Sequence, residues 1–219
     1  MNNTFALTDP LALADLTVYL SRVRLVDDTA VRVIAGGGVL AVYSAVLAPR
    51  GLLDRSPTVL GLRTFAEASG VQFDRVLAPA SLADRIAKIR ADGTETFEVN
   101  LPDSDVTASW AGISPPRGGW EHMGTLSSVA LELIARDGAG EVARAIPAHT
   151  GDLIVQKVRS EVWSRPLDAH PVVPAGVAFA AASLGFIAGE EEEVALYRSG
   201  SWLRASAYRG HVLARSLHG

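Results

Sequence analysis

Apolar residues recur at helical spacing directly after Asp9-Pro10, a pair that suits the N-cap and the first position of a helix. The stripe that predicts this helix consists of Leu11, Leu13, Leu16, Tyr19, Leu20 and Val23. Valine-rich runs then predict four strands, over residues 30–35, 39–47, 58–66 and 72–77. A second amphipathic helix is predicted over 79–91, followed by strands over 94–101 and 106–113. This order predicts an α+β domain in which two helices accompany an antiparallel sheet.

The second half of the chain has a mainly helical pattern that ends in short strands. Helices are predicted over residues 126–136, 140–146, 150–163 and 174–187. Short strands are predicted over residues 193–197, 202–208 and 212–216. Helices followed by a hairpin match the outline of a winged-helix module, so we expect a winged-helix-like β-hairpin at the C-terminal end.

The run 114–119 (SPPRGG) is the clearest interruption of the pattern. We therefore expect a first domain over 1–113, a linker over 114–119 and a second domain over 120–219. Charge does not separate the two halves, and the division rests on the change from strand-rich to helix-rich pattern.

Composition restricts the classes of partner and of chemistry. The 219 residues are 48% hydrophobic and 20% charged, so the chain can bury a core and should be ordered. The net charge of −4 argues against nucleic acid or an anionic membrane as the main partner. The sequence contains no cysteine, which excludes disulfides and thiolate sites and fits a reducing cytoplasm. The mean hydropathy of +0.22 favours a dense core and an apolar oligomer face.

No targeting or membrane segment is predicted. The N-terminus lacks a basic region and carries Asp9 and Asp15, unlike a signal peptide. The uncharged run over 169–189 contains Pro171 and Pro174, which favours a buried helix over a membrane span. We expect a cytoplasmic protein without membrane contact.

No cofactor or metal site is predicted. Gly36-Gly37-Gly38 follows a strand, but valine-rich sequence follows it, which favours a hairpin turn over a dinucleotide loop. None of the five histidines lies three or four positions from another, and no Gly-x-Ser-x-Gly or P-loop motif is present. The chain therefore carries no self-sufficient catalytic set, which favours a protein that is not an enzyme.

Two clusters of side chains remain as candidate sites. Arg117, Trp120, Glu121 and His122 combine an anion binder, a stacking ring and two proton-transfer groups at the expected joint between the domains. The alternative is that they only pack this joint.

Arg198, Arg204 and Arg209 lie in the basic hairpin region and could contact phosphates. The helix expected over 174–187 has no residue but Ser183 that could contact base edges, so nucleic-acid binding is disfavoured. Reuse of this module for protein contact is the preferred interpretation.

Several stretches resemble an uncharacterised protein family of high-GC Gram-positive bacteria. They are SWAGISPPRGGW at 109–120, VWSRPL at 162–167, PAGVAFA at 174–180, SGSWLR at 199–204 and RGHVL at 209–213. The resemblance implies a bacterial cytoplasmic protein with this two-part layout and transfers no catalytic residue. The order of elements in the first domain is also similar to one repeat of a DNA sliding clamp, a likeness of topology alone.

The leading hypothesis is a non-catalytic cytoplasmic binding protein that forms a homo-oligomer or contacts another protein. The first alternative is a small-molecule sensor or enzyme with its pocket at the joint. The second is a DNA-associated protein that uses the basic hairpin.

Overall fold

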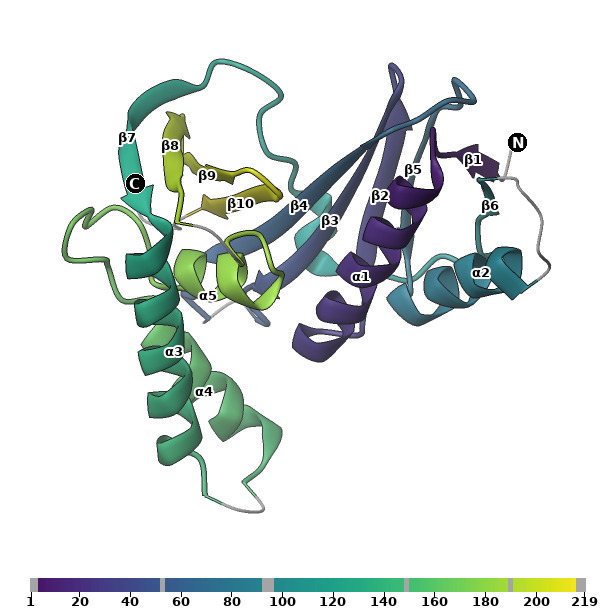
Figure 1. Cartoon of the computed structure of the whole chain (residues 1–219). Coiled ribbons are helices and arrows are strands. Elements are labelled where there is room, and N and C mark those ends of the chain that lie inside the picture. Colours follow the sequence, from purple (N-terminus) through teal and green to yellow (C-terminus); the bar gives the residue numbers. More distant parts are fainter. Residues whose placement is uncertain (1–3, 52–53, 92–96, 148–149, 189–190, 216–219) are drawn as a thin grey trace. The chain divides into compact units, whose positions relative to one another are not determined.

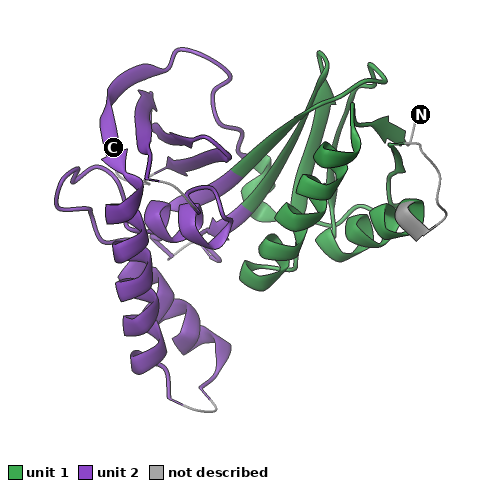
Figure 2. Ribbon diagram, viewed as in Figure 1, with its two compact units in different colours: residues 1–44, 62–112 green, residues 45–61, 113–219 purple. Residues whose placement is uncertain are grey.

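The chain forms two compact units in a computed structural model that describes residues 4–51, 54–91, 97–147, 150–188 and 191–215. Unit 1 comprises Met1–Ser44 and Leu62–Gly112, and unit 2 comprises Ala45–Gly61 and Ile113–Gly219 (Figure 2). Two long strands, β3 (Val39–Leu47) and β4 (Thr58–Ala66), contribute residues to both units.

Unit 1 combines two helices with an antiparallel sheet (Figure 1). Its strands run in the order β5-β2-β3-β4, and a separate two-stranded sheet pairs β1 with β6. The remaining elements of this unit are β1 (Thr4–Ala6), α1 (Pro10–Val26), β2 (Val31–Gly36), β5 (Phe73–Leu77), α2 (Pro79–Ala91), β6 (Glu98–Asn100) and the 3-10 helix η1 (Ser109–Gly112). The mixture of helix and sheet agrees with the predicted α+β class.

The helix α1 begins as its sequence predicts. The Asp9 side chain accepts a hydrogen bond of 2.8 Å from the backbone N–H of Ala12, and Pro10 occupies the first turn. The buried face carries Leu13, Leu16, Tyr19, Leu20 and Val23. Leu11 was predicted in the same stripe, but 79% of it is exposed because it lies on the opposite side of the helix.

The buried face of α1 contacts the sheet through one polar side chain. The Tyr19 hydroxyl lies 2.9 Å from Oγ of Ser44 in β3, and both side chains are buried. Burial raises the pKa of Tyr19 well above its ordinary value. The hydroxyl is therefore neutral, and its hydrogen bond satisfies a buried polar group.

The glycine run forms the predicted hairpin turn. Gly36 pairs with Val39, and Gly37 and Gly38 form the two-residue loop between β2 and β3 with φ values of 61° and 76°. Positive φ at both positions is the requirement of a tight hairpin turn, which glycine meets without steric cost.

Unit 2 combines three helices with an antiparallel sheet. Its strands run in the order β4-β10-β9-β8-β7. The elements are β7 (Glu121–Ser127), α3 (Ser128–Ala145), α4 (Asp152–Trp163), α5 (Gly176–Ser183), β8 (Glu193–Ser199), β9 (Trp202–Ala207) and β10 (Gly210–Arg215). The Trp163 and Phe179 rings stack at 4.4 Å between centroids and join α4 to α5.

Several predicted elements differ in the structure. The C-terminal strands do not stand apart as a wing, because β8 pairs with β7 and β10 neighbours β4, so the winged-helix-like arrangement is not confirmed. Residues 126–136 and 140–146 were predicted as two helices separated by Asp137-Gly138, yet α3 runs through this position. A Cβ at Gly138 would lie only 2.4 Å from Cζ3 of Trp163, the last residue of α4. Glycine at this position therefore lets α3 pack closely against α4.

The strands predicted over 94–101 and 106–113 are mostly absent from the residues that the structure describes. Within them only Glu98–Asn100 is a strand, and Ser109–Gly112 is a 3-10 helix. Residues 94–96 of the first prediction lie outside the described residues.

Candidate functional site

In unit 2 the strand β7 begins with Glu121 and His122, and Trp120 directly precedes it. Glu121 and His122 are exposed and Trp120 is half-buried. Arg117 precedes them and is exposed. Because adjacent residues of a strand point to opposite faces, Glu121 and His122 project away from each other. The four residues therefore do not converge on one pocket.

Two of these residues instead join a stack of rings around Arg204. The guanidinium carbon of Arg204 lies 4.6 Å from the ring centroid of Trp120 and 4.6 Å from that of Tyr197. The His122 ring contacts Tyr197 edge-on at 5.4 Å. The register explains this arrangement, since His122 faces Tyr197 on β8 and Tyr197 faces Arg204 on β9. The structure thus places members of both sequence clusters in one contact, which we call the Arg204 stack.

The Arg204 stack changes the interpretation of the basic hairpin. Arg204 is half-buried between two rings, and its Nε is buried without a hydrogen-bond partner among the described residues. Arg198 lies one residue from Tyr197, on the other face, and its Nε donates to the Gly200 carbonyl at 3.1 Å. Arg209 is exposed between β9 and β10. The three arginines do not form one surface that could follow a phosphate backbone.

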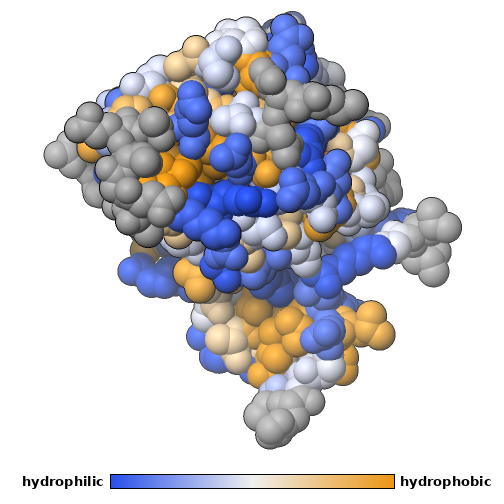
Figure 3. Space-filling view, turned by 90° about the vertical axis from the view of Figure 1, so that its right-hand side faces the viewer, coloured by the Kyte–Doolittle hydropathy of each residue, from blue (hydrophilic) through white to orange (hydrophobic). Residues whose placement is uncertain are grey.

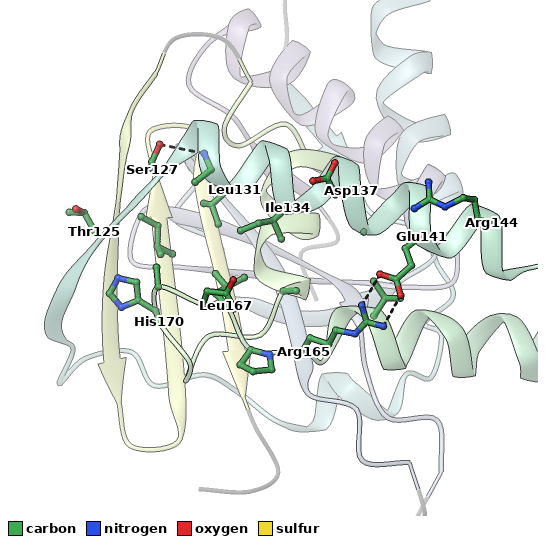
Figure 4. A pocket seen from close by; sticks show the side chains of 18 residues that line it. Thr125, Ser127, Leu131, Ile134, Asp137, Glu141, Arg144, Arg165, Leu167 and His170 are labelled. Carbon is green, nitrogen blue, oxygen red and sulfur yellow. Dashed lines mark hydrogen bonds and ion pairs between the residues drawn. The ribbon is translucent and has the colours of Figure 1, made fainter.

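A cavity of about 680 Å³ lies elsewhere in unit 2, between the start of α3 and the segment 165–175 (Figure 4). Most of its wall is apolar. The lining residues are Thr125, Leu126, Ser127, Ala130, Leu131, Ile134, Asp137, Gly138, Glu141, Arg144, Val162, Arg165, Pro166, Leu167, Asp168, Ala169, His170 and Ala175. None of the candidate residues from the sequence is among them.

Charged side chains gather at one end of this cavity. The Arg165 guanidinium donates two hydrogen bonds of 2.7 Å to the two carboxylate oxygens of Glu141, and Asp137 and Arg144 lie on the same stretch of α3 (Figure 4). The hydrogen bonds from Arg165, helped by the nearby charge of Arg144, hold the pKa of Glu141 below its ordinary value. This end of the cavity therefore stays charged at neutral pH.

The segment 165–175 is held as a closed loop by its own backbone. The N–H of Leu167 donates to the Val173 carbonyl at 2.9 Å, and the N–H of Ala175 donates to the Arg165 carbonyl at 2.7 Å. The loop positions His170 at the other end of the cavity, near Thr125 and Ser127 (Figure 4). A closed loop of this kind presents a cavity wall that is already formed.

The cavity can bind a molecule with an apolar body and polar ends, because apolar walls separate two polar regions. Among the described residues, its lining contains no serine–histidine–acid arrangement at hydrogen-bonding distance. The sequence carried one overlooked signal: Asp137, Glu141 and Arg144 share one face of a helix only if residues 126–146 form a single helix.

The described residues include no group of three or more metal-ligating side chains, and His149 and His218 lie outside them. Among the described helices, none combines the length and the apolar character that crossing a membrane requires.

Both halves of the chain match domain families. Residues 1–112 match the family described as domain of unknown function (DUF8010), and residues 115–219 match domain of unknown function (DUF8185). A search of curated proteins finds no match.

Solved structures with a similar fold are bacterial DNA sliding clamps. DNA polymerase III subunit beta from Borrelia burgdorferi aligns with a TM-score of 0.53 and 8% identity, over 100% of this chain and 65% of that chain. The sliding clamp from Bartonella birtlesii aligns with a TM-score of 0.51 and 12% identity, over 99% and 65%. The chain spans about two thirds of the length of these clamps. At such identity the likeness concerns the fold alone, and it extends over both halves rather than only the first.

Proposed function

The chain belongs to the DUF8010 family, and we propose that it is a non-catalytic cytoplasmic binding protein that assembles with copies of itself. The proposal is supported by one observation: large apolar side chains gather on the outer faces of helices. Isolated exposed apolar residues are ordinary, but a row on one helix face is typical of a contact surface.

The row lies on α1 in unit 1. Leu11, Val18 and Leu25 are 79%, 51% and 88% exposed. They are seven residues apart, so they lie on one side of the helix, opposite the face that packs against the sheet. We call these three residues the α1 outer stripe. The helix is thus apolar on both sides, and the residues that the structure describes cover only one of them.

Unit 2 carries a second apolar surface that could contact a different protein. At the start of α4, Leu153 is 88% exposed and Ile154 is 55% exposed. The lower lobe of Figure 3, which corresponds to the far end of the α3–α4 pair in Figure 1, shows apolar atoms gathered there. This surface supports the partner-protein form of the proposal.

Sedimentation velocity of the wild-type protein, from roughly 1 to 300 µM, tests self-association because weak interfaces have dissociation constants in this range. We expect an average mass that rises with concentration above the 23.1 kDa of one chain. A mass of one chain at every concentration would remove the proposal.

A second candidate function is small-molecule binding, which the cavity of unit 2 favours. A thermal-shift screen of metabolites tests it, since a ligand at 100 times its dissociation constant adds about 2.7 kcal/mol. The variant Ala130→Phe fills part of the cavity and should abolish the shift. Val129→Phe is the matched control, because Val129 is exposed and does not line the cavity. Equal shifts in both variants would place the ligand elsewhere.

We infer that DNA is not the main partner. The inference is supported by the net charge of −4 and by the separation of Arg198, Arg204 and Arg209. We expect no retention of a short duplex at low salt, and salt-sensitive binding would contradict this.

A further inference from the structure

We propose that α1 pairs with α1 of a second copy, and that the two helices run antiparallel. The inference rests on the self-association proposed above and adds the surface, the partner and the orientation. It rests on three features of α1: the α1 outer stripe, the small residues beside it, and the charges along one flank.

The α1 outer stripe has the geometry of a helix-pairing seam. A helix turns by 100° per residue, so a seven-residue step returns to almost the same side. Leu11, Val18 and Leu25 therefore form three apolar layers along the 17 residues of α1, which correspond to a length of about 25 Å. Val18 lies at the centre, so a two-fold axis through it brings Leu11 of one copy against Leu25 of the other.

Small side chains lie between these layers. Ala14 follows Leu11 by three residues, and Ser21 follows Val18 by three residues. In a heptad repeat this step leads from the first to the second position of the seam between paired helices. In the antiparallel arrangement Ala14 of one helix comes close to Ser21 of the second copy. Two small residues at this level let the helices approach until the larger stripe residues interlock.

The charges along one flank select the antiparallel orientation. Asp15 and Arg22 each follow a stripe residue by four positions, so they border the seam on the same side. In an antiparallel pair this flank meets itself, and Asp15 of each copy lies near Arg22 of the other. In a parallel pair this flank of one helix meets the other flank of the second helix, which carries Pro10 and Thr17. Arg22 would then face Thr17, and Asp15 would face Pro10. Only the antiparallel pair joins opposite charges, and symmetry makes the contact twice.

Both charged groups are accessible for this contact. Asp15 accepts a hydrogen bond of 2.9 Å from Nε of Arg63, yet 41% of its side chain remains exposed. Arg22 makes no ion pair within the part of the chain that the structure describes. The Asp15 carboxylate has two oxygens and can accept from a second guanidinium.

Cysteine cross-linking tests the orientation directly, because the natural sequence contains no cysteine. The single variants are Leu11→Cys, Val18→Cys and Leu25→Cys, with Lys88→Cys on the exposed face of α2 as the matched control. A disulfide forms only when two Cα atoms come within about 7 Å. Under mild oxidation we expect Val18→Cys to cross-link to itself at least tenfold faster than Lys88→Cys.

The mixture of Leu11→Cys and Leu25→Cys decides the direction of the helices. We expect this mixture to cross-link at least tenfold faster than either variant alone. Fast cross-linking of Leu11→Cys alone and of Leu25→Cys alone would show a parallel pair and overturn the orientation. Cross-linking of Val18→Cys at the rate of the Lys88→Cys control would overturn the interface itself.

The mass of the wild-type protein separates this inference from the proposed function. A wild-type oligomer whose Val18→Cys variant does not cross-link would leave self-association intact and move it to another surface. A wild-type monomer at every concentration would remove both. All three substituted positions are at least half exposed, so these variants should keep the wild-type melting temperature, which a thermal melt verifies.

Discussion

The helices α1 and α3 are nearly equal in length, but they use their surfaces differently. Within unit 2, α3 packs one side against α4 and α5, and another side forms a cavity wall with charged residues at one end. Within unit 1, α1 packs one side against the sheet and leaves Leu11, Val18 and Leu25 exposed. The large apolar side chains that α3 leaves exposed, Val129 and Leu133, lie near its start. Those of α1 run along the whole helix and are not covered by the residues that the structure describes.

This contrast separates two kinds of variant. Substitutions on the outer side of α1 should change assembly and leave the free energy of unfolding unchanged, because exposed side chains contribute little to the fold. Substitutions on the contact side of either helix should change the free energy of unfolding.

The two sides of α1 give the largest contrast. Leu16→Ala removes a fully buried side chain and should lower the free energy of unfolding by about 3 kcal/mol. Leu25→Ala removes a side chain that is 88% exposed. At concentrations where the protein is monomeric, this variant should change the free energy of unfolding by less than about 0.5 kcal/mol. Urea denaturation at low protein concentration measures both. Equal effects would mean that the outer side of α1 is covered within the chain.

Two glycines of α3 test the contact side of that helix. A Cβ at Gly138 would lie 2.4 and 2.5 Å from the Trp163 ring, which is buried, so Gly138→Ala should destabilise by about 2 kcal/mol. At Gly140 the nearest atom is Nη1 of Arg144, at 3.3 Å on a flexible side chain. Gly140→Ala should therefore stabilise by up to about 1 kcal/mol through helix propensity. A stabilising Gly138→Ala variant would disprove the close contact of α3 with Trp163.

Glu67 fixes the strand that precedes α1. It is buried, and its carboxylate accepts hydrogen bonds from the N–H groups of Ala6, Ser69 and Gly70, at 3.1, 2.9 and 2.8 Å. Burial alone would raise the pKa of Glu67, but hydrogen bonds from Ser69, Ala6 and Gly70 outweigh it and lower the pKa. Glu67→Gln should lower the free energy of unfolding at pH 7 by about 1–2 kcal/mol, because an amide accepts fewer hydrogen bonds.

The sign of the pH effect follows from the lowered pKa. The stabilisation by the Glu67 carboxylate is present above the pKa of the unfolded chain and is lost as the pH falls through the folded pKa. Urea denaturation between pH 6 and pH 3 should show wild-type stability falling more steeply than that of Glu67→Gln. Parallel curves would show that the Glu67 carboxylate does not cause the loss of stability at low pH.

The ion pair at the cavity end should give the smallest effect. The side chains of Arg165 and Glu141 are 53% and 42% exposed, and pairs near the surface contribute little because water and salt screen them. Arg165→Ala should shift the melting temperature by no more than about 2 °C. A loss of more than about 5 °C would mean that the loop 165–175 depends on this pair.

The local features of the fold were predictable from the sequence, and the contacts between distant elements were not. The Asp9 cap, the Gly37-Gly38 turn and the buried stripe of α1 depend on neighbouring residues. The continuation of α3 through Gly138 depends on the Trp163 ring, which is 25 positions away. Local propensity indicates a stop there, and tertiary packing overrides it.

The candidate sites show the same limit. Trp120, His122 and Arg204 were each identified, but their contact depends on the register of β7, β8 and β9. Leu11 was predicted in the apolar stripe because its spacing also fits the helical pattern, although its side chain is exposed. The cavity depends on the closed loop 165–175, whose backbone hydrogen bonds leave no sequence signal.

The central claim is that the α1 outer stripe is the self-association surface. Sedimentation velocity of the wild type and of Val18→Arg, each across the same range of concentration, tests it most directly. Because Val18 is 51% exposed, the arginine should leave the fold intact, while two arginines would meet at the two-fold axis. We expect the wild type to increase in mass with concentration and Val18→Arg to remain at one chain. Equal association of both proteins would contradict the claim.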